Sequence, residues 1–385
     1  MTKPRAFVYV QHLLGIGHLK RAAVLARALS AQGVDTTLAS GGPVPAGFEM
    51  KSVRLVQLPP ARAADMSFKR LLDANGAEID DAWRSRRAAA LMLAWREARA
   101  QVLIVELYPF GRRQMRFELK PLLEAAVSAS PRPALVCSVR DILGGLKTPE
   151  RQEEALALVE KYFDKVLVHG DARVLPFERT FPLAHRIAVR IVHTGFVVED
   201  APAAQGEAGK DEVVVSAGGG VVGAPLLEAA LHAKPLCVLR DRTWRVLAGN
   251  NLPDEDFRRI GALAAAQPGV VFERSRADFT TLLANCALSV SQAGYNTLLE
   301  TMQARAPAVV VPFARGETEQ TLRARCVAAR GLLEIVEEES LTPQTLAAAI
   351  DRAAQRPAPA VGAIDLDGAR KSAALIAQLA QERLA

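Results

Sequence analysis

Short apolar runs alternate with longer helical stretches along most of this 385-residue chain, and this alternation limits the fold more than any other feature. In the first half it predicts strands at residues 6–11, 35–39, 55–58, 102–106, 134–138, 165–168 and 191–193. Helices are predicted between them, including 19–32 and an Ala- and Arg-rich helix at 78–99. Such alternation is typical of a parallel sheet covered on both faces, so the chain belongs to the α/β class.

A second strand–helix series begins at residue 212, after a segment that looks like a linker. Residues 199–211 combine Pro, Ala, Gly and charge without periodicity. The following strands are predicted at 212–216, 235–239, 270–272, 288–290 and 308–311, with helices from 224 and at 296–305. A chain of this length suits two cores. We therefore predict two Rossmann-like domains, 1–198 and 212–366, and a final amphipathic helix within 367–385.

Composition narrows the setting of the protein. No apolar run reaches the roughly 18 to 20 residues that span a bilayer, and the N-terminus lacks a secretory apolar region. The four cysteines are far apart and form no CxxC pair, which favours reduced thiols in a cytoplasmic protein over disulfides or zinc.

Charge is distributed unevenly between the two halves. Residues 1–200 hold 29 Lys and Arg against 21 Asp and Glu, whereas residues 201–385 hold 19 against 21. A basic first half suits peripheral contact with an anionic membrane or a phosphorylated acceptor, and solvated Arg-rich faces are the alternative. Nucleic acid is not an expected partner, because no basic run is interleaved with aromatics.

Residues 289–320 carry the most specific functional signal: a strand end, a Gly turn, a helix, and a second strand closed by Pro312. Gly294 stands at the helix start, where free N–H groups and the helix dipole favour a phosphate. Glu300, further along the helix, can accept hydrogen bonds from a ribose diol. Glu319 and Gln320 follow the next strand, at the sheet edge where α/β proteins bind ligands.

There are two further glycine-containing loops, one after the first strand of each half. Gly218, Gly219 and Gly220 leave backbone N–H groups unshielded for a diphosphate, although glycine runs also form flexible turns. In the first half, Gly15 and Gly17 precede His18. Lys20 occupies the position of the third glycine of a dinucleotide fingerprint, so a nicotinamide cofactor is not predicted.

The segment 289–320 resembles the donor-binding region of GT-B glycosyltransferases, in particular the family 28-like enzymes that include the lipid II-forming N-acetylglucosaminyltransferase. The matching residues are Ser291, Gly294, Thr297, Glu300, Pro307, Pro312, Glu319 and Gln320. Arg305-Ala306 depart from the pattern, which usually has a Gly close before the Pro. The run Gly-x-Gly-His-x-x-Arg at 15–21 is similar to the first loop of the same enzymes.

The resemblance implies a GT-B arrangement with parallel sheets facing an interdomain cleft, and a last helix that packs back on the first domain. It also implies inverting transfer of a hexosyl group from a UDP-linked sugar to a hydroxyl, on a glycan, lipid-linked or small-molecule acceptor, in cell envelope glycan synthesis. His18 would remove the acceptor proton, and neutral imidazole suits that step. No metal or other cofactor is implied, and a cytoplasmic location is expected, with attachment to the inner membrane face as an option.

On the acceptor side, polar residues follow several strands of the first half. We expect Gly15, Gly17, Arg21, Glu106, Arg112, Arg113 and Asp141 at this edge. Arg side chains suit phosphate, and salt bridges between loops are the alternative.

Two other functions share these features. A GT-B nucleotide-sugar hydrolase or 2-epimerase would release free sugar without an acceptor. A non-catalytic nucleotide-sugar-binding protein would bind UDP and turn nothing over.

Overall fold

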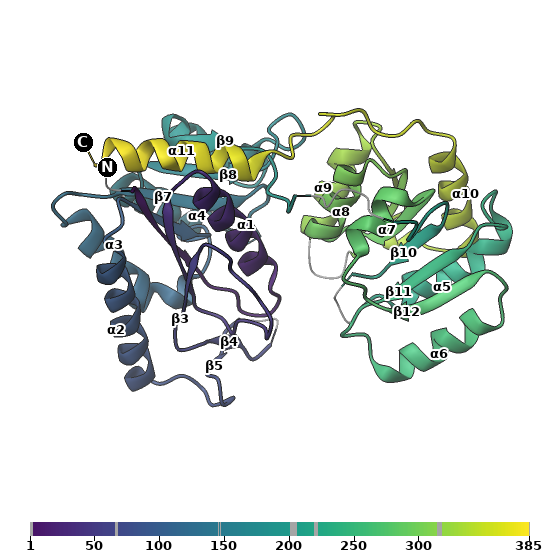
Figure 1. Cartoon of the computed structure of the whole chain (residues 1–385), viewed down its shortest axis with the longest axis horizontal. Coiled ribbons are helices and arrows are strands. Elements are labelled where there is room, and N and C mark those ends of the chain that lie inside the picture. The colour runs from purple at the N-terminus through teal and green to yellow at the C-terminus, as the bar shows by residue number, and fades with distance from the viewer. Residues whose placement is uncertain are drawn as a thin grey trace. The chain divides into compact units, whose positions relative to one another are not determined.

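The fold is that of a computed structural model, which describes residues 3–65, 68–144, 146, 148–200, 206–218, 222–313 and 318–384. The chain forms two compact units (Figure 1). The first comprises Met1–Val198 and Asp367–Ala385, and the second comprises Glu199–Leu366.

The first unit is built on a seven-stranded sheet whose strands all pair in parallel. Its strands are β1 (Arg5–Val10), β2 (Asp35–Ser40), β3 (Arg54–Gln57), β6 (Val102–Glu106), β7 (Ala134–Arg140), β8 (Lys165–His169) and β9 (Ile191–His193). The spatial order is β3-β2-β1-β6-β7-β8-β9. The direction of winding reverses between β1 and β6, so a ligand crevice is expected at their carboxyl ends.

Helices and a small hairpin surround this sheet. The helices are α1 (Gly17–Ala31), α2 (Asp81–Ala98), η1 (Arg113–Met115), α3 (Arg116–Val127), α4 (Pro149–Tyr162), η2 (Phe177–Arg179), η3 (Pro182–Arg190) and α11 (Gly368–Glu382), and the hairpin pairs β4 (Arg62–Ala63) with β5 (Leu71–Leu72). Helix α11 lies against α1 (Figure 1), and Ile376 and Ala380 are buried in the same core as Leu25 and Leu29.

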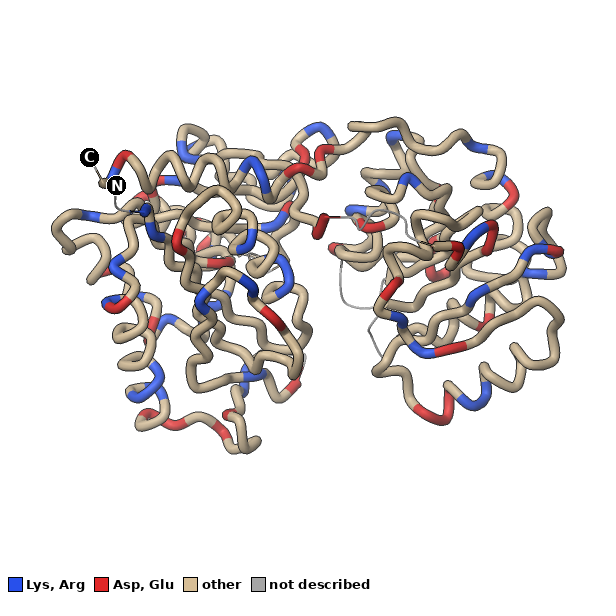
Figure 2. Tube along the Cα trace, viewed as in Figure 1, with Lys and Arg blue, Asp and Glu red and all other residues tan. Residues whose placement is uncertain are grey.

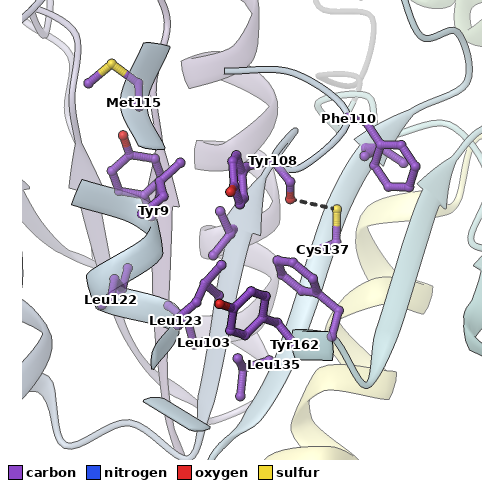
Figure 3. Packing of buried hydrophobic residues seen from close by; sticks show 14 of the residues in the cluster. Tyr9, Leu103, Tyr108, Phe110, Met115, Leu122, Leu123, Leu135, Cys137 and Tyr162 are labelled. Carbon is purple, nitrogen blue, oxygen red and sulfur yellow. Dashed lines mark hydrogen bonds between the residues drawn. The ribbon is translucent and has the colours of Figure 1, made fainter. Parts of the chain in front are cut away.

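The strands of the first unit are apolar on both faces, which is why helices cover both sides of the sheet. On one face, Tyr9, Leu103 and Leu135 pack with Leu122 and Leu123 of α3 (Figure 3). In the same core the Cys137 thiol donates a hydrogen bond to the Tyr108 carbonyl oxygen at 3.2 Å. Burial raises the pKa of this thiol, so Cys137 serves as packing rather than as a nucleophile.

The second unit contains a six-stranded parallel sheet in the order β12-β11-β10-β13-β14-β15. Its strands are β10 (Val213–Ser216), β11 (Trp244–Ala248), β12 (Val270–Arg274), β13 (Leu288–Gln292), β14 (Ala308–Val311) and β15 (Glu334–Ile335). Its helices are α5 (Ala224–Ala233), η4 (Lys234–Leu236), α6 (Asp254–Ala265), α7 (Phe279–Asn285), α8 (Tyr295–Ala304), α9 (Thr318–Ala328), η5 (Glu338–Ser340) and α10 (Pro343–Ala354). Here the winding reverses between β10 and β13, which marks the second expected crevice.

The strand predicted at 235–239 is wrong. Its apolar side chains Leu236 and Val238 are 50% and 58% exposed, and the chain there forms a 3₁₀ turn. The strand that pairs with β10 on this side is β11, whereas β13 pairs with β10 on the other; β11 was not predicted because Arg245 interrupts its apolar run. Arg245 is accommodated by ion pairs to Glu212 at 2.6 Å and to Glu273 at 2.7 Å.

Part of the segment predicted as a linker is fixed against the second unit. The Asn285 side-chain amide donates to the carbonyl oxygens of Gly206 and Ala208 at 3.1 and 2.9 Å. Gly209 has φ +81, and a Cβ there would lie 2.7 Å from the backbone of Leu282. Residues 206–211 therefore form a packed turn, and residues 201–205 lie outside the described residues.

The chain leaves the first unit and returns to it at one place. Val197 and Asp367 form an antiparallel bridge, and the Gly368 N–H donates to the Phe196 carbonyl oxygen at 3.0 Å. A Cβ on Gly368 would lie 2.2 Å from the Gly195 oxygen, so only glycine fits this crossing.

Candidate functional site

The carboxyl ends of β1 and β6 in the first unit bring together His18, Arg21 and Glu106. Glu106 is the last residue of β6, and His18 and Arg21 lie on the first turns of α1. The Nδ1 atom of His18 is 2.8 Å from Oε1 of Glu106, and Arg21 donates to the same oxygen. The side chain of Glu106 is only 2% exposed and that of His18 is 17% exposed, so the imidazole lies at the opening of the buried cluster.

The protonation states of this cluster follow from burial and charge. Burial raises the pKa of Glu106, but His18 and Arg21 together hold that pKa well below its usual range. Burial lowers the pKa of His18 to about 4, against the opposing effect of Glu106. At neutral pH Glu106 is thus a carboxylate, which only accepts hydrogen bonds, so Nδ1 of His18 carries the proton and Nε2 carries the lone pair. This is the state that a general base requires.

The loop before His18 is tightly packed at its start, at Gln11 and His12, whereas the space around its glycines is open. Cβ atoms on Gly15 or Gly17 would meet no atom within 4 Å. In contrast, a Cβ on Gly41 would lie 2.1 Å from Oε1 of Gln11, and one on Gly42 would lie 2.5 Å from the His12 ring. The start of the loop is therefore fixed in place, and the loop has room for a ligand at Gly15 and Gly17.

Arg87, a buried arginine that was not predicted as a site residue, helps to fix Gln11 at the start of this loop. Arg87 is 0% exposed, and its Nε lies 2.8 Å from Oε2 of the equally enclosed Glu118. Its Nη2 donates to Oε1 of Gln11 at 3.0 Å. The sequence does contain a signal, because Arg87 falls on the four-residue spacing of the apolar side chains Trp83 and Leu91 on α2.

The arginines predicted on the acceptor side separate into two groups. The Nε of Arg112 donates to the Gln11 carbonyl oxygen at 2.6 Å, which places it at the His18 loop. Arg113 instead pairs with Glu154 at 3.0 Å, and Arg116 reaches the same carboxylate at 3.2 Å. Arg113 thus takes the salt-bridge arrangement that was the alternative.

A second buried polar row lies at the ends of β7, β8 and β9. Ser138 Oγ is 2.7 Å from Nε2 of His169, whose Nδ1 is 2.9 Å from Oγ1 of Thr194. Burial lowers the pKa of His169 to about 3, so its ring is neutral. Asp141, another predicted residue, is buried beside this row, where a Cβ on Gly170 would lie 2.7 Å from its Cβ. Enclosure of the row indicates a structural role for it.

The second unit presents the predicted glycine loops at its own crevice. Gly218, just after β10, has φ +67, and a Cβ there would meet no atom within 4 Å. Gly219 and Gly220 lie outside the described residues. Gly294 precedes α8, whose first turn has no side-chain cap, and space around Gly294 is likewise open. Uncapped N–H groups of α8 therefore lie at the switch between β10 and β13.

The other predicted donor residues lie on β13, α8 and α9. Ser291 is fully buried near the end of β13, whereas Thr297 and Glu300 are partly exposed on α8. Glu319 pairs with the buried Arg323 at 2.8 Å. The side-chain oxygen of Gln320 accepts a hydrogen bond from the Phe313 N–H at 3.1 Å. The Gln320 contact connects the start of α9 to the residues that follow β14, whereas the Glu319 pair lies within α9.

In the described ranges no helix combines the length and the apolar character needed to cross a membrane. The same ranges contain no group of three or more His, Cys, Asp and Glu side chains that could hold a metal ion.

Solved structures with the same architecture are glycosyltransferases. The glycotransferase of kitacinnamycin is 17% identical with a TM-score of 0.62, covering 100% of both chains. MurG from Acinetobacter baumannii is 17% identical with a TM-score of 0.60, covering 98% of this chain and 100% of that one. Likeness at this identity establishes the fold: the chain has the GT-B fold of these glycosyltransferases, as predicted.

Within that class, residues 214–376 match the glycosyltransferase family 28 C-terminal domain. The UDP-N-acetylglucosamine--N-acetylmuramyl-(pentapeptide) pyrophosphoryl-undecaprenol N-acetylglucosamine transferase of Geobacillus kaustophilus (strain HTA426) is 29% identical over 186 residues, covering 45% of this chain. The match spans 50% of the length of that relative. Residues 214–376 are thus similar to the family 28 C-terminal domain, which confirms the resemblance predicted from residues 289–320.

Proposed function

We propose that the protein is an inverting glycosyltransferase that moves a hexosyl group from a UDP-linked sugar to an acceptor hydroxyl. The observation that carries this proposal is the His18–Glu106 pair at the switch point of the first unit. It supplies a neutral imidazole whose Nδ1 is held at 2.8 Å by a buried carboxylate. The family 28 domain in the second unit supports the choice of a nucleotide-sugar donor.

In this mechanism the acceptor oxygen attacks the anomeric carbon while the bond from that carbon to the diphosphate oxygen breaks. The acceptor proton passes to Nε2 of His18, and Glu106 stabilises the imidazolium that forms. Arg21 keeps Glu106 ionised, so the carboxylate can act as an orienting acceptor throughout.

The leaving diphosphate is assigned to the second unit. The uncapped N–H groups of α8 after Gly294 and the backbone of Gly218 offer hydrogen bonds where the negative charge develops. Glu300 is assigned to the ribose, and Glu319 and Gln320 to the sugar hydroxyls. Because N–H donors and the helix dipole stabilise the leaving diphosphate in this proposal, it requires no metal.

The acceptor class rests on the relatives. The relative from Geobacillus kaustophilus is named for transfer to a pyrophosphoryl-undecaprenol-linked sugar, so we take a lipid-linked hydroxyl as the first acceptor to test. A cytoplasmic location with peripheral contact to an anionic membrane would fit such an acceptor. Lys and Arg are mixed with Asp and Glu along the first unit (Figure 2), so this contact would use several elements rather than one basic segment.

The test begins with binding and then measures turnover. Thermal unfolding is recorded with UDP, GDP, dTDP and ADP, for the wild type and for Glu300→Ala. Loss of hydrogen bonds to a charged group corresponds to about 1.5–3 kcal/mol, so the variant should bind UDP roughly 10- to 150-fold more weakly.

Release of UDP from UDP-sugars is then followed with and without lipid-linked acceptors. Acceptor-dependent release that His18→Asn abolishes supports transfer. Release of free sugar at full rate without an acceptor would indicate a hydrolase instead, and absence of any nucleotide binding would contradict the proposal.

A further inference from the structure

Arg112 is held in an unusual backbone conformation beside the His18 loop. It has φ 59 and ψ 31, a left-handed geometry that is sterically unfavourable for a non-glycine residue. A tight turn imposes it: the Gly111 N–H donates to the Leu107 carbonyl oxygen at 2.9 Å. A Cβ on Gly111 would lie 2.9 Å from the Leu107 side chain. Strain that is maintained in this way is characteristic of functional positions.

One edge of the Arg112 guanidinium is fixed by a buried network. Its Nε donates to the Gln11 carbonyl oxygen at 2.6 Å. The Gln11 side chain in turn donates to the carbonyl oxygens of His12 at 2.7 Å and Ala61 at 3.0 Å, and accepts from Arg87. Gln11 and Arg87 are both fully buried, so the direction of the guanidinium is set by rigid structure rather than by solvent.

The other edge of the guanidinium is available. Among the described residues the two Nη groups of Arg112 have no hydrogen-bond or ion-pair partner, and the residue is partly exposed. A guanidinium anchored at Nε with both Nη groups open presents a planar fork that suits an oxyanion. Its neighbours Arg113 and Arg116 differ, because both pair with Glu154.

The position of Arg112 relates it to the proposed chemistry. Burial is the main cause of the lowered pKa of His18, and the charges of Arg112 and Arg21 add to it, so Arg112 lies within electrostatic range of the base. Arg21 and Arg140 likewise lie within range of Arg112, together with the single carboxylate of Glu106. Arg21 and His18 share the Glu106 carboxylate, and Arg112 forms no ion pair with a described residue, so the positive charge of its own guanidinium is not directly paired.

We propose that Arg112 binds an anionic group of the acceptor, phosphoryl or carboxylate, next to the hydroxyl that attacks. This assignment rests on the proposed function for identifying the anion as part of an acceptor. Arg112 contacts the start of the same loop at Gln11, and the space around Gly15 and Gly17 further along that loop is open. Arg112 thereby makes the enzyme specific for charged acceptors, whereas the donor site is in the second unit.

The experiment uses the full chain with ¹³C-labelled histidine side chains, in saturating UDP so that the donor site is occupied. Sodium pyrophosphate and sodium malonate are titrated separately at constant ionic strength, and the resonance of His18, assigned with His18→Asn, is followed. The variants are Arg112→Gln, Arg112→Lys and the matched control Arg116→Gln. We expect a saturable His18 shift whose dissociation constant rises about tenfold or more in Arg112→Gln and stays within about twofold in Arg116→Gln.

Arg112→Lys, which keeps the charge but lacks the fork, should weaken binding less than Arg112→Gln. Tighter binding of pyrophosphate indicates a phosphoryl group, and tighter binding of malonate indicates a carboxylate. Absence of a saturable shift in the wild type, or equal affinities in the wild type and Arg112→Gln, would overturn the assignment. UDP affinity and the thermal transition, measured on the same samples, separate this failure from loss of the fold or of the proposed function.

Discussion

Replacing Glu106 by Gln tests the central pair most directly. The amide keeps the size of the side chain but removes the charge that orients His18 and pairs with Arg21. A hydrogen bond to a charged group contributes about 1.5–3 kcal/mol, and the Nδ1–Oε1 bond gains this strength only when His18 becomes imidazolium. Since about 1.36 kcal/mol corresponds to a tenfold change in rate, kcat should fall roughly 10- to 150-fold with little change in KM.

The assay is the initial rate of UDP release at saturating donor and acceptor, for Glu106→Gln, His18→Asn and the double variant. Removing a general base costs about 10²- to 10⁴-fold. If Glu106 acts through His18, the double variant should be no slower than His18→Asn alone. An equal loss from Glu106→Gln in both backgrounds would refute the coupling, because Glu106 would then act independently of His18.

The pH profile provides a second check on the same pair. A base must be deprotonated to act, so the rate falls as pH decreases through its pKa, which for His18 is about 4. We expect kcat/KM to be flat on the acidic side between about pH 5.5 and 8, and Glu106→Gln to move the acid limb lower because the carboxylate raises the pKa of His18. An acid limb near the ordinary histidine value would contradict the role assigned to burial.

Three further predictions concern stability. The pKa of His169 is about 3 in the folded state and 6.5 in the unfolded state, so its contribution to stability should be complete above pH 6.5 and should fall below that pH by up to ~1.4 kcal/mol per pH unit. His169→Asn should remove this contribution to the pH dependence of the unfolding free energy, measured in urea titrations at pH 7.0 and 5.5. An unchanged pH dependence in the variant would contradict the prediction. Arg87→Met alone should destabilise the fold by about 3–5 kcal/mol because it leaves the charge of Glu118 buried without a partner. The double variant Arg87→Met with Glu118→Met should recover most of that loss in the same titrations. Equal losses in the single and double variants would show that the ion pair has a net stabilising effect. Gly41→Ala should destabilise the fold by about 1–3 kcal/mol because its Cβ would lie 2.1 Å from Gln11 Oε1 and 2.3 Å from Arg87 Nη2. The control Gly144→Ala, whose Cβ would meet no atom within 4 Å, should have nearly the wild-type melting temperature. Similar melting temperatures for the two variants would argue against rigid packing around Gln11.

Much of the fold could be predicted because its strands are short continuous apolar runs. The predicted limits of β6 and β14 match the structure, and the final helix was placed within two residues of α11. The error at 235–239 has a physical cause, since an exposed apolar turn and a buried strand have similar composition. Strand β11 escaped notice because Arg245 is neutralised by Glu212 and Glu273, which lie far from it in sequence.

The candidate site was predictable in part for related reasons. His18 and Glu106 could be placed at strand ends, but their contact at 2.8 Å depends on which strands become neighbours in the sheet. The difference between Arg112 and Arg113 depends on one left-handed residue and on Glu154 of a later helix, and local sequence contains neither. The burial of Arg87 is harder still to predict from the sequence, because only its partners in the fold distinguish it from the solvated arginines around it.

The bridge between Val197 and Asp367 makes the second unit an insert within the first in terms of chain connectivity. Since bridged Cα atoms are about 5 Å apart, a turn of a few residues could join these two positions and excise 199–366 as a cassette. The remaining chain would keep α11 on α1 and the whole seven-stranded sheet. By the same connectivity, a cut after residue 366 would remove a core helix from the first unit and leave the second intact, so the C-terminus of the chain belongs to the domain in which the chain begins.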